Sequence, residues 1–123
     1  MPALLLVMTG GAIGAGARHL AGRAVLAWLG AAFPWGTLFV NLSGGLLMGV
    51  LAGSLARVTA GEPWRLFLGV GVLGGYTTFS SFSLDVVTLV QRGEGAAAIG
   101  YLLLSVAGTI AALVAGLALT RLA

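Results

Sequence analysis

The chain has 123 residues, of which 59% are hydrophobic and only 7% are charged, and its mean hydropathy is +1.11. Because about a quarter of the residues in soluble domains are charged, this composition excludes an ordinary soluble protein and indicates an integral membrane protein. The six arginines and three acids, with a net charge of +3, are too few and too scattered for a nucleic-acid-binding patch, and the absence of cysteine excludes a disulfide or a thiolate metal site.

Three polar breaks divide the chain into four apolar segments, each long enough for the roughly 20 residues of a membrane-spanning helix. The breaks are Phe33-Pro34-Trp35-Gly36, Glu62-Pro63 and Gly93-Glu94-Gly95. Because the loops are very short, we predict an all-α, polytopic up-and-down bundle. We expect a single transmembrane domain over residues 1–123, with spans at about 3–29, 36–56, 65–90 and 96–120.

The first segment has a signal-peptide-like end at Ala15-Gly16-Ala17, but no Lys or Arg precedes its apolar run, so we expect a transmembrane helix instead. It carries Arg18 roughly 20 Å along its axis. We expect this permanent positive charge to lie in a water-filled vestibule or to extend to an interface. We expect His19 to be an interfacial residue, because it has no Cys, His or carboxylate partner for a metal site.

The second segment contains an asparagine, Asn41, about five residues from its start. An amide is costly in lipid unless it is paired. Asn41 therefore either bonds a neighbouring helix or donates its NH₂ group to a permeating anion, and the sequence leaves both alternatives open. Ser43 lies close by and adds a hydroxyl donor.

Residues 74–83, Gly-Gly-Tyr-Thr-Thr-Phe-Ser-Ser-Phe-Ser, place many polar groups in the middle of the third segment. Two adjacent glycines weaken a helix, so we predict a break at Gly74-Gly75. A break frees carbonyls that suit a hard cation and amides that suit an anion. Phe79 and Phe82 share one helical face and either pack or turn their positive ring edges toward an anion path. For Asp85 we favour an ion pair with an arginine, or a cap on a polar turn, over a proton-binding role.

The fourth segment carries one polar stripe, because Tyr101, Ser105 and Thr109 are four residues apart. A single Ser or Thr usually bonds back to its own helix. Three aligned hydroxyls fit packing and a relay of hydrogen-bond donors equally well.

Glycine is far more frequent than the usual rate of about 7%, with 21 glycines in the chain, many at intervals of four. Small residues at this spacing let helices approach closely in lipid. The pattern predicts tight helix contacts and says nothing about a substrate. Its members are Gly45, Gly49 and Gly53, then Gly71 and Gly75, then Gly108, Ala112 and Gly116.

The arginines do not determine an orientation in the membrane. Four spans place Arg57, Arg65 and Arg121 on the side of the termini, and Arg18, Arg23 and Arg92 on the other. Since a Lys/Arg bias normally sets orientation, we predict insertion both ways and an antiparallel homodimer, unless Arg18 lies too deep to count. Four helices cannot surround a wide lumen, so a permeation path would be very narrow or would follow a subunit interface.

Three motifs are distinctive: Gly-Gly-Ala-Ile-Gly-Ala-Gly-Ala-Arg at 10–18, Gly-Thr-Leu-Phe-Val-Asn at 36–41, and the highly specific stretch at 74–83. Together they resemble the Fluc (CrcB) family of fluoride channels. The likeness extends over most of the chain, which has the length and the four-span layout of that family. It implies a multi-pass protein of the cell inner (plasma) membrane, a dual-topology homodimer with two antiparallel pores, and passive, fluoride-selective export. The resemblance also implies that the protein is not an enzyme.

The resemblance also implies roles for individual residues. Arg18 is similar to a vestibule arginine, and the backbone carbonyls of Gly74 and Thr77 are expected to hold a structural Na⁺ at the dimer interface. In that family, serine is the more familiar residue at the position of Thr109, and threonine is often seen at the position of Ser81. Each departure keeps the hydroxyl group. The expected fluoride pore residues are Asn41, Phe79, Phe82, Ser80, Thr78, Tyr101, Ser105 and Thr109.

The main alternative is a small proton-coupled, dual-topology drug exporter. Such carriers need a membrane-embedded carboxylate, typically in the first span, and the first span here has none. Asp85 is the only candidate. A purely structural membrane subunit is a third interpretation.

Overall fold

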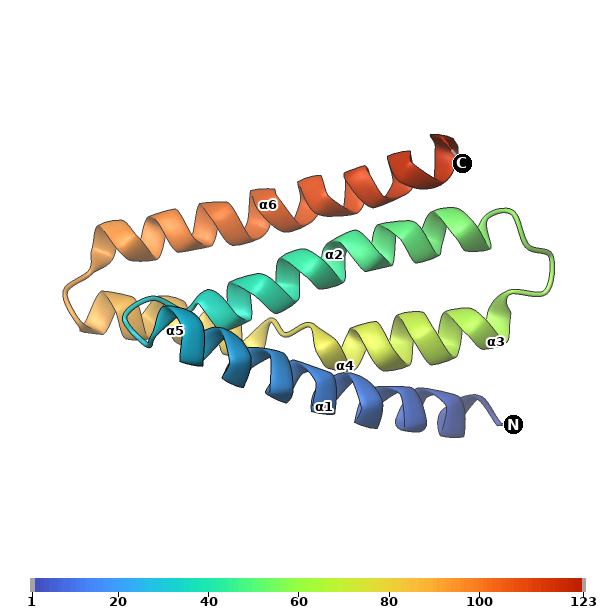
Figure 1. The fold of residues 1–123 in the computed structure, drawn as a ribbon, viewed down its shortest axis with the longest axis horizontal. Coiled ribbons are helices and arrows are strands. Elements are labelled where there is room, and N and C mark those ends of the chain that lie inside the picture. The colour runs from blue at the N-terminus through green and yellow to red at the C-terminus, as the bar shows by residue number, and fades with distance from the viewer. Residues whose placement is uncertain (1, 123) are drawn as a thin grey trace.

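The computed structural model describes residues 2–122, which form helices joined by short connections (Figure 1). It confirms the all-α class and the four-span layout. The first, second and fourth spans are single helices, whereas the third consists of consecutive shorter pieces. The single helices are α1 (Ala3–Leu29), α2 (Trp35–Leu55) and α6 (Gly95–Leu122), and the pieces are α3 (Glu62–Trp64), the π-helix η1 (Arg65–Leu73), α4 (Gly74–Tyr76) and α5 (Ser80–Gln91).

The helices have the length and composition that a bilayer requires. α1, α2 and α6 are each long and apolar enough to cross a membrane. Both termini and the connection before α3 lie at one end of the bundle, and the other two loops lie at the opposite end (Figure 1). Many large apolar side chains on all four spans are exposed, including Leu20, Leu84 and Leu103. Such a surface suits contact with lipid or with another membrane chain.

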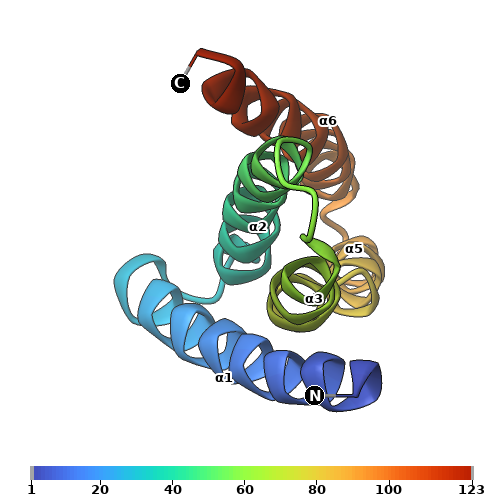
Figure 2. The ribbon, with the colours of Figure 1, turned by 90° about the vertical axis from the view of Figure 1, so that its right-hand side faces the viewer.

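The spans pack in pairs, as the view along the bundle shows (Figure 2). α2 lies against α6 over much of its length, and α1 lies against η1 and α4. α1 also contacts α2, and α5 contacts α6. A small buried cluster joins α2, α5 and α6 at one end of the bundle; its members are Leu38, Phe82, Leu89, Ala98 and Tyr101.

Glycines bring the backbones of the paired helices into contact, as the sequence predicts. A methyl group added to Gly116 would lie 2.7 Å from the Val50 amide nitrogen and would also meet the Leu46 carbonyl. A methyl group at Gly71 would lie 2.9 Å from the Gly10 Cα atom. Because these neighbours are backbone atoms, they cannot rotate away, so only glycine allows this helix separation.

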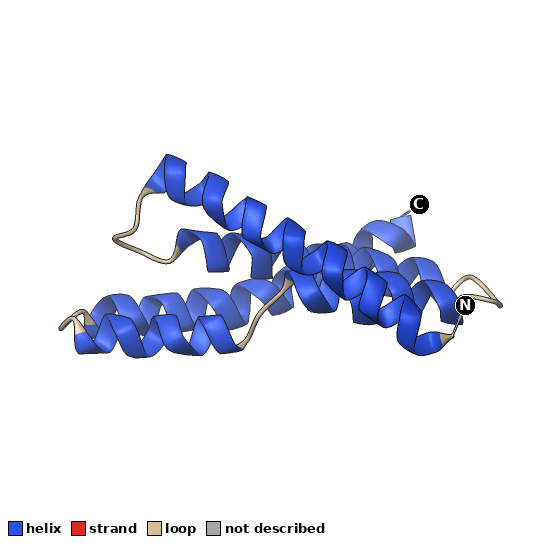
Figure 3. Cartoon of the chain, turned by 90° about the horizontal axis from the view of Figure 1, so that it is seen from below, coloured by secondary structure: helices blue, strands red, loops and turns tan. Residues whose placement is uncertain are grey.

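The third span is broken near its middle, but the predicted position of the break is wrong. Gly74 and Gly75 belong to α4, and the non-helical residues are 77–79 (Figure 3). Thr77 is extended, with φ −86° and ψ 160°. Gly75 instead serves close packing, since a methyl group there would lie 2.6 Å from the Gly11 carbonyl oxygen. Gly75 therefore seats α4 against α1, and the chain leaves the helix after Tyr76.

We predict that Gly116→Ala lowers the stability of the fold by about 1–3 kcal/mol, because the added methyl group forces α2 and α6 apart. Gly100→Ala, on the same helix, is the control, because a methyl group there meets nothing within 4 Å. Unfolding in detergent with increasing SDS measures both variants. Equal stabilities for the two variants would contradict the assigned α2–α6 contact.

Candidate functional site

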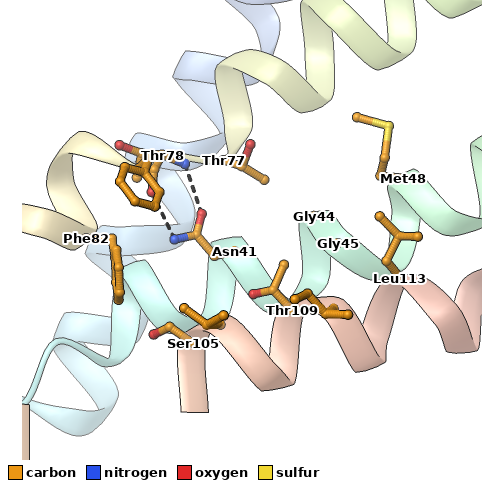
Figure 4. Close-up of a pocket in the computed structure, with 13 residues that line it drawn as sticks. Asn41, Gly44, Gly45, Met48, Thr77, Thr78, Phe82, Ser105, Thr109 and Leu113 are labelled. Atoms are coloured by element: carbon orange, nitrogen blue, oxygen red, sulfur yellow. Dashed lines mark hydrogen bonds between the residues drawn. The ribbon is translucent and has the colours of Figure 1, made fainter. Parts of the chain in front are cut away.

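Asn41 on α2 binds the backbone of the break through two hydrogen bonds (Figure 4). Asn41 Nδ2 donates to the Thr78 carbonyl oxygen at 3.0 Å, and the Thr78 amide donates to Asn41 Oδ1 at 2.9 Å. An unwound segment within a membrane persists only where its polar backbone groups are satisfied. Asn41 therefore stabilises the break, and the second Nδ2 hydrogen is left for another acceptor.

Hydroxyl groups fix the two helix ends at the break. Thr77 Oγ1 donates to the Leu73 carbonyl at 2.9 Å, and Thr78 Oγ1 accepts a hydrogen bond from the Ser81 amide at 3.2 Å. The second contact caps the first turn of α5, where free amides need acceptors. Ser80 is exposed, with its Oγ 3.4 Å from Thr78 Oγ1. Part of the polar stretch therefore builds the break itself.

A cavity of about 390 Å³ lies beside the break, bounded by α2, the start of α5 and α6 (Figure 4). The remainder of its lining is mainly apolar and includes Met48, Ile110 and Leu113. Ser80 and Tyr101 are not among its lining residues. The cavity brings together most of the predicted site residues: Asn41, Thr77, Thr78, Phe79, Phe82, Ser105 and Thr109.

The two phenylalanines have different environments although their rings are neighbours. Their centroids are 5.5 Å apart with an angle of 55° between the planes. Phe82 is 7% exposed and packs on Tyr101 at 5.3 Å, whereas Phe79 is 76% exposed. Phe82 therefore belongs to the interior of a single chain. Phe79 stands at the open side of the cavity.

The predicted polar stripe of α6 divides into separate contacts. Tyr101 is completely buried, and its hydroxyl donates to Asp85 Oδ2 at 2.9 Å. Ser105 is 4% exposed, and its Oγ makes no hydrogen bond of ordinary geometry within the described residues, although the Tyr101 hydroxyl lies nearby. Because a buried hydroxyl without a partner is costly, its position at the cavity suits a ligand that accepts a hydrogen bond. Thr109 is half-buried at the same cavity.

The predicted ion pair of Asp85 is wrong. The two ion pairs within residues 2–122 are Glu62–Arg65 and Arg92–Glu94. Asp85 instead accepts the Tyr101 hydrogen bond inside the bundle, where a phenol offers a donor without a second charge.

Arg18 lies at a second cavity of about 400 Å³. Its Nε donates to the Gly75 carbonyl at 3.1 Å, which holds the guanidinium beside the C-terminal end of α4. Thr78 lines both cavities, so they meet at the break. Arg23, His19 and Thr37 also line this cavity and were not predicted there. The spacing of His19 and Arg23 by four residues, which places both on one helical face, was the available signal.

Backbone carbonyl groups at the C-terminal end of α4 lie close to the break. The Thr78 amide, which would normally bond the Gly74 carbonyl, is bound to Asn41, and no hydrogen bond reaches that carbonyl within residues 2–122. Gly74 is exposed, and Thr77 is half-buried. The described residues contain no group of three or more His, Cys, Asp or Glu that could hold a metal. The groups that could ligate a cation at this point are backbone carbonyl oxygens.

Comparison with known proteins identifies the family of this chain. The family model described as CrcB-like protein, Camphor Resistance (CrcB), matches residues 5–117. The fluoride-specific ion channel FluC of Sphingopyxis alaskensis is 55% identical over 98% of this chain and 97% of its own length. The protein of the same name from Phenylobacterium zucineum is 56% identical over 98% and 97% of the two chains. This chain therefore belongs to the CrcB-like family.

Proposed function

We propose that the protein is a fluoride-selective ion channel that exports fluoride passively across the plasma membrane and so limits its toxicity in the cytoplasm. The main support is that relatives more than half identical over nearly their whole length are named fluoride-specific ion channels. The cavity beside the break adds physical support, because amide and hydroxyl groups and two aromatic side chains line an otherwise apolar wall there. Passive permeation breaks no covalent bond, so the protein is not an enzyme.

The selectivity follows from replacing water around a small, strongly hydrated anion. Leaving water is costly unless donors take the place of the hydration shell. The Ser105 hydroxyl and the second Nδ2 hydrogen of Asn41 offer such donors, and Thr109 lies one turn further along α6. The positive edges of Phe79 and Phe82 add weak attraction. Several weak sites in series let the ion enter and leave.

We extend the proposal to an antiparallel homodimer. A single chain leaves the cavity open where Phe79 stands 76% exposed, so the path needs a further wall. Without Arg18, which is bound near the break, three arginines lie at the end of the bundle with the termini and two lie at the other end. This small difference sets no strong orientation, which suits insertion both ways. A second copy of opposite orientation would close the cavity of each chain by the same contact.

The carbonyls of Gly74 and Thr77 would hold a structural Na⁺ between the two copies. A bound cation would supply a fixed positive charge that holds two carbonyl-rich helix ends together. This chain contributes an exposed Gly74 carbonyl without an internal donor, at the negative end of α4. The extended backbone at Thr77 turns the chain away from the helix at that point.

The drug-exporter alternative is less well supported. Its only candidate carboxylate, Asp85, is bound to a buried tyrosine hydroxyl and lines neither the cavity with Phe79 nor the one with Arg18. The relatives are named as channels for one anion.

We predict that Phe79→Ala and Phe82→Ala both reduce fluoride efflux but differ in stability. Phe82→Ala empties a buried site and costs about 3–5 kcal/mol of fold stability. Phe79→Ala removes an exposed ring and leaves the stability of the single chain nearly unchanged. A fluoride electrode measures efflux from proteoliposomes, and unfolding in SDS measures stability. Wild-type efflux in both variants would contradict the pore assignment.

We predict that Ser105→Ala lowers fluoride efflux while stability stays equal or rises by about 1 kcal/mol, because the hydroxyl has no internal partner to lose. Ser54→Ala is the matched control, since Ser54 is an exposed serine near the end of α2, away from the cavity. Efflux that is equal in the two variants would show that Ser105 does not donate to the ion.

We predict that exchange of Na⁺ for a large organic cation lowers both fluoride efflux and dimer stability, because the carbonyls then lack a ligand of suitable size. Readdition of Na⁺ should restore both. Cross-linking yield in detergent gives the dimer fraction. Full efflux and an intact dimer after complete removal of Na⁺ would contradict the cation site.

A further inference from the structure

The break in the third span lies across α2 at Gly44, where α2 has no side chain. A methyl group added to Gly44 would meet the Thr77 Cγ2 atom and would lie 3.3 Å from Cδ2 of the Tyr76 ring. Tyr76 is the last residue of α4, and Thr77 is the first residue of the break. The side chains of both residues therefore lie directly against α2.

Tyr76 makes a hydrogen bond to α2 that is separate from the contacts of Asn41. The Tyr76 hydroxyl oxygen lies 2.9 Å from Ser43 Oγ. The single hydroxyl hydrogen of Ser43 goes to the Phe39 carbonyl, 2.7 Å away in the same helix, so the Tyr76 hydroxyl is the donor to Ser43. Both side chains are half-buried. A phenol hydroxyl inside a membrane bundle is unfavourable without such a partner.

Ser43 and Asn41 attach the third span to different sides of α2. Residues two apart in a helix are separated by about 200°, so these two side chains leave α2 in nearly opposite directions. Asn41 holds Thr78, which lies inside the break. Ser43 holds Tyr76, at the end of the helix before the break. One attachment would let the break turn about that point, whereas two attachments on different sides oppose the turn.

Thr77 lies between the two attachments, and Asn41 fixes the peptide group that follows it. The Thr77 carbonyl and the Thr78 amide belong to one planar trans peptide group, so they point in opposite directions. Since the Thr78 amide donates to Asn41 Oδ1 at 2.9 Å, the Thr77 carbonyl points away from Asn41. A rotation of the chain at Tyr76 would break this pairing, and the Asn41 side chain would lose the partner that orients it.

We propose that Ser43 and Tyr76 are positioning residues of the channel. Their hydrogen bond holds the end of α4 on α2, which keeps Asn41 paired with Thr78 and so orients its second Nδ2 hydrogen for a permeating anion. The inference rests on the proposed channel function. Neither Ser43 nor Tyr76 lines the cavity beside the break, so both act through Asn41.

The first test compares variants that differ in one hydroxyl group. Ser43→Val and Ser43→Thr give side chains of the same shape, and only threonine keeps a hydroxyl that can also bond the carbonyl one turn earlier. Tyr76→Phe removes the donor and leaves the Ser43–Phe39 bond intact. We expect fluoride efflux to fall about fivefold in Ser43→Val and in Tyr76→Phe, because one ordinary hydrogen bond changes an equilibrium by about this factor. Ser43→Thr should retain wild-type efflux.

The double variant Ser43→Val/Tyr76→Phe tests whether the two hydroxyl groups act as a pair. It should lose no more efflux than either single variant, because each single change already removes the same bond. A loss of about 25-fold, the product of two independent effects, would overturn the inference. Equal efflux from Ser43→Val and Ser43→Thr, or wild-type efflux from Tyr76→Phe, would overturn it as well.

The second test reads the position of the break without transport. Hydrogen exchange followed by mass spectrometry reports how often the Thr78 amide leaves Asn41. Tyr76→Phe should speed exchange about fivefold in a peptide that covers residues 77–80 and leave α6 unchanged, and Asn41→Ala is the positive control. Wild-type exchange at residues 77–80, or an equal rise in α6, would overturn the inference.

The two tests separate this inference from the proposed function. Wild-type protein that passes no fluoride would count against the channel itself. The exchange measurement would still decide whether the Tyr76 hydroxyl holds the break on α2, because it needs no ion flux.

Discussion

The pairing of one side-chain amide with one peptide group supports the rest of the site. Asn41 offers one acceptor and one donor, and the Thr78 residue needs one of each where the third span is unwound. In a bilayer, no water replaces these partners, so an unpaired break would be strongly unfavourable. With both bonds made, α5 can begin as a separate helix. Its start then places Phe82 inside the bundle and leaves Phe79 at its surface.

Two layers of backbone contact hold the break in position. α2 packs on α6, and α1 packs on η1 and α4, through glycines that leave no room for a side chain. Such contacts give rigid walls, because peptide groups cannot change rotamer. The cavities therefore occur where the break interrupts these walls, and Thr78 borders both of them. The cavity with Arg18 is lined by positive charge, and the cavity with Phe79 is apolar with a few hydroxyl groups. This arrangement suits collection of an anion in the first cavity and its dehydration in the second.

The sequence predicts features that depend on local composition. The four spans follow from the length of the apolar runs, and the glycine contacts follow from spacing. The position of the break was missed because a glycine pair signals flexibility and close packing equally, and Gly75 serves packing. The partners of Asn41 and Asp85 were missed because they depend on how helices rotate against each other. The π-helix η1 leaves no pattern of its own in an apolar run of this kind.

Donors beside the Asn41-bound break should replace the water around fluoride better than the water around a larger halide. Efflux of fluoride and of chloride can be compared in parallel sets of liposomes that contain only this protein. We predict rapid loss of fluoride and retention of chloride. Equal loss of both ions, or retention of fluoride, would contradict it.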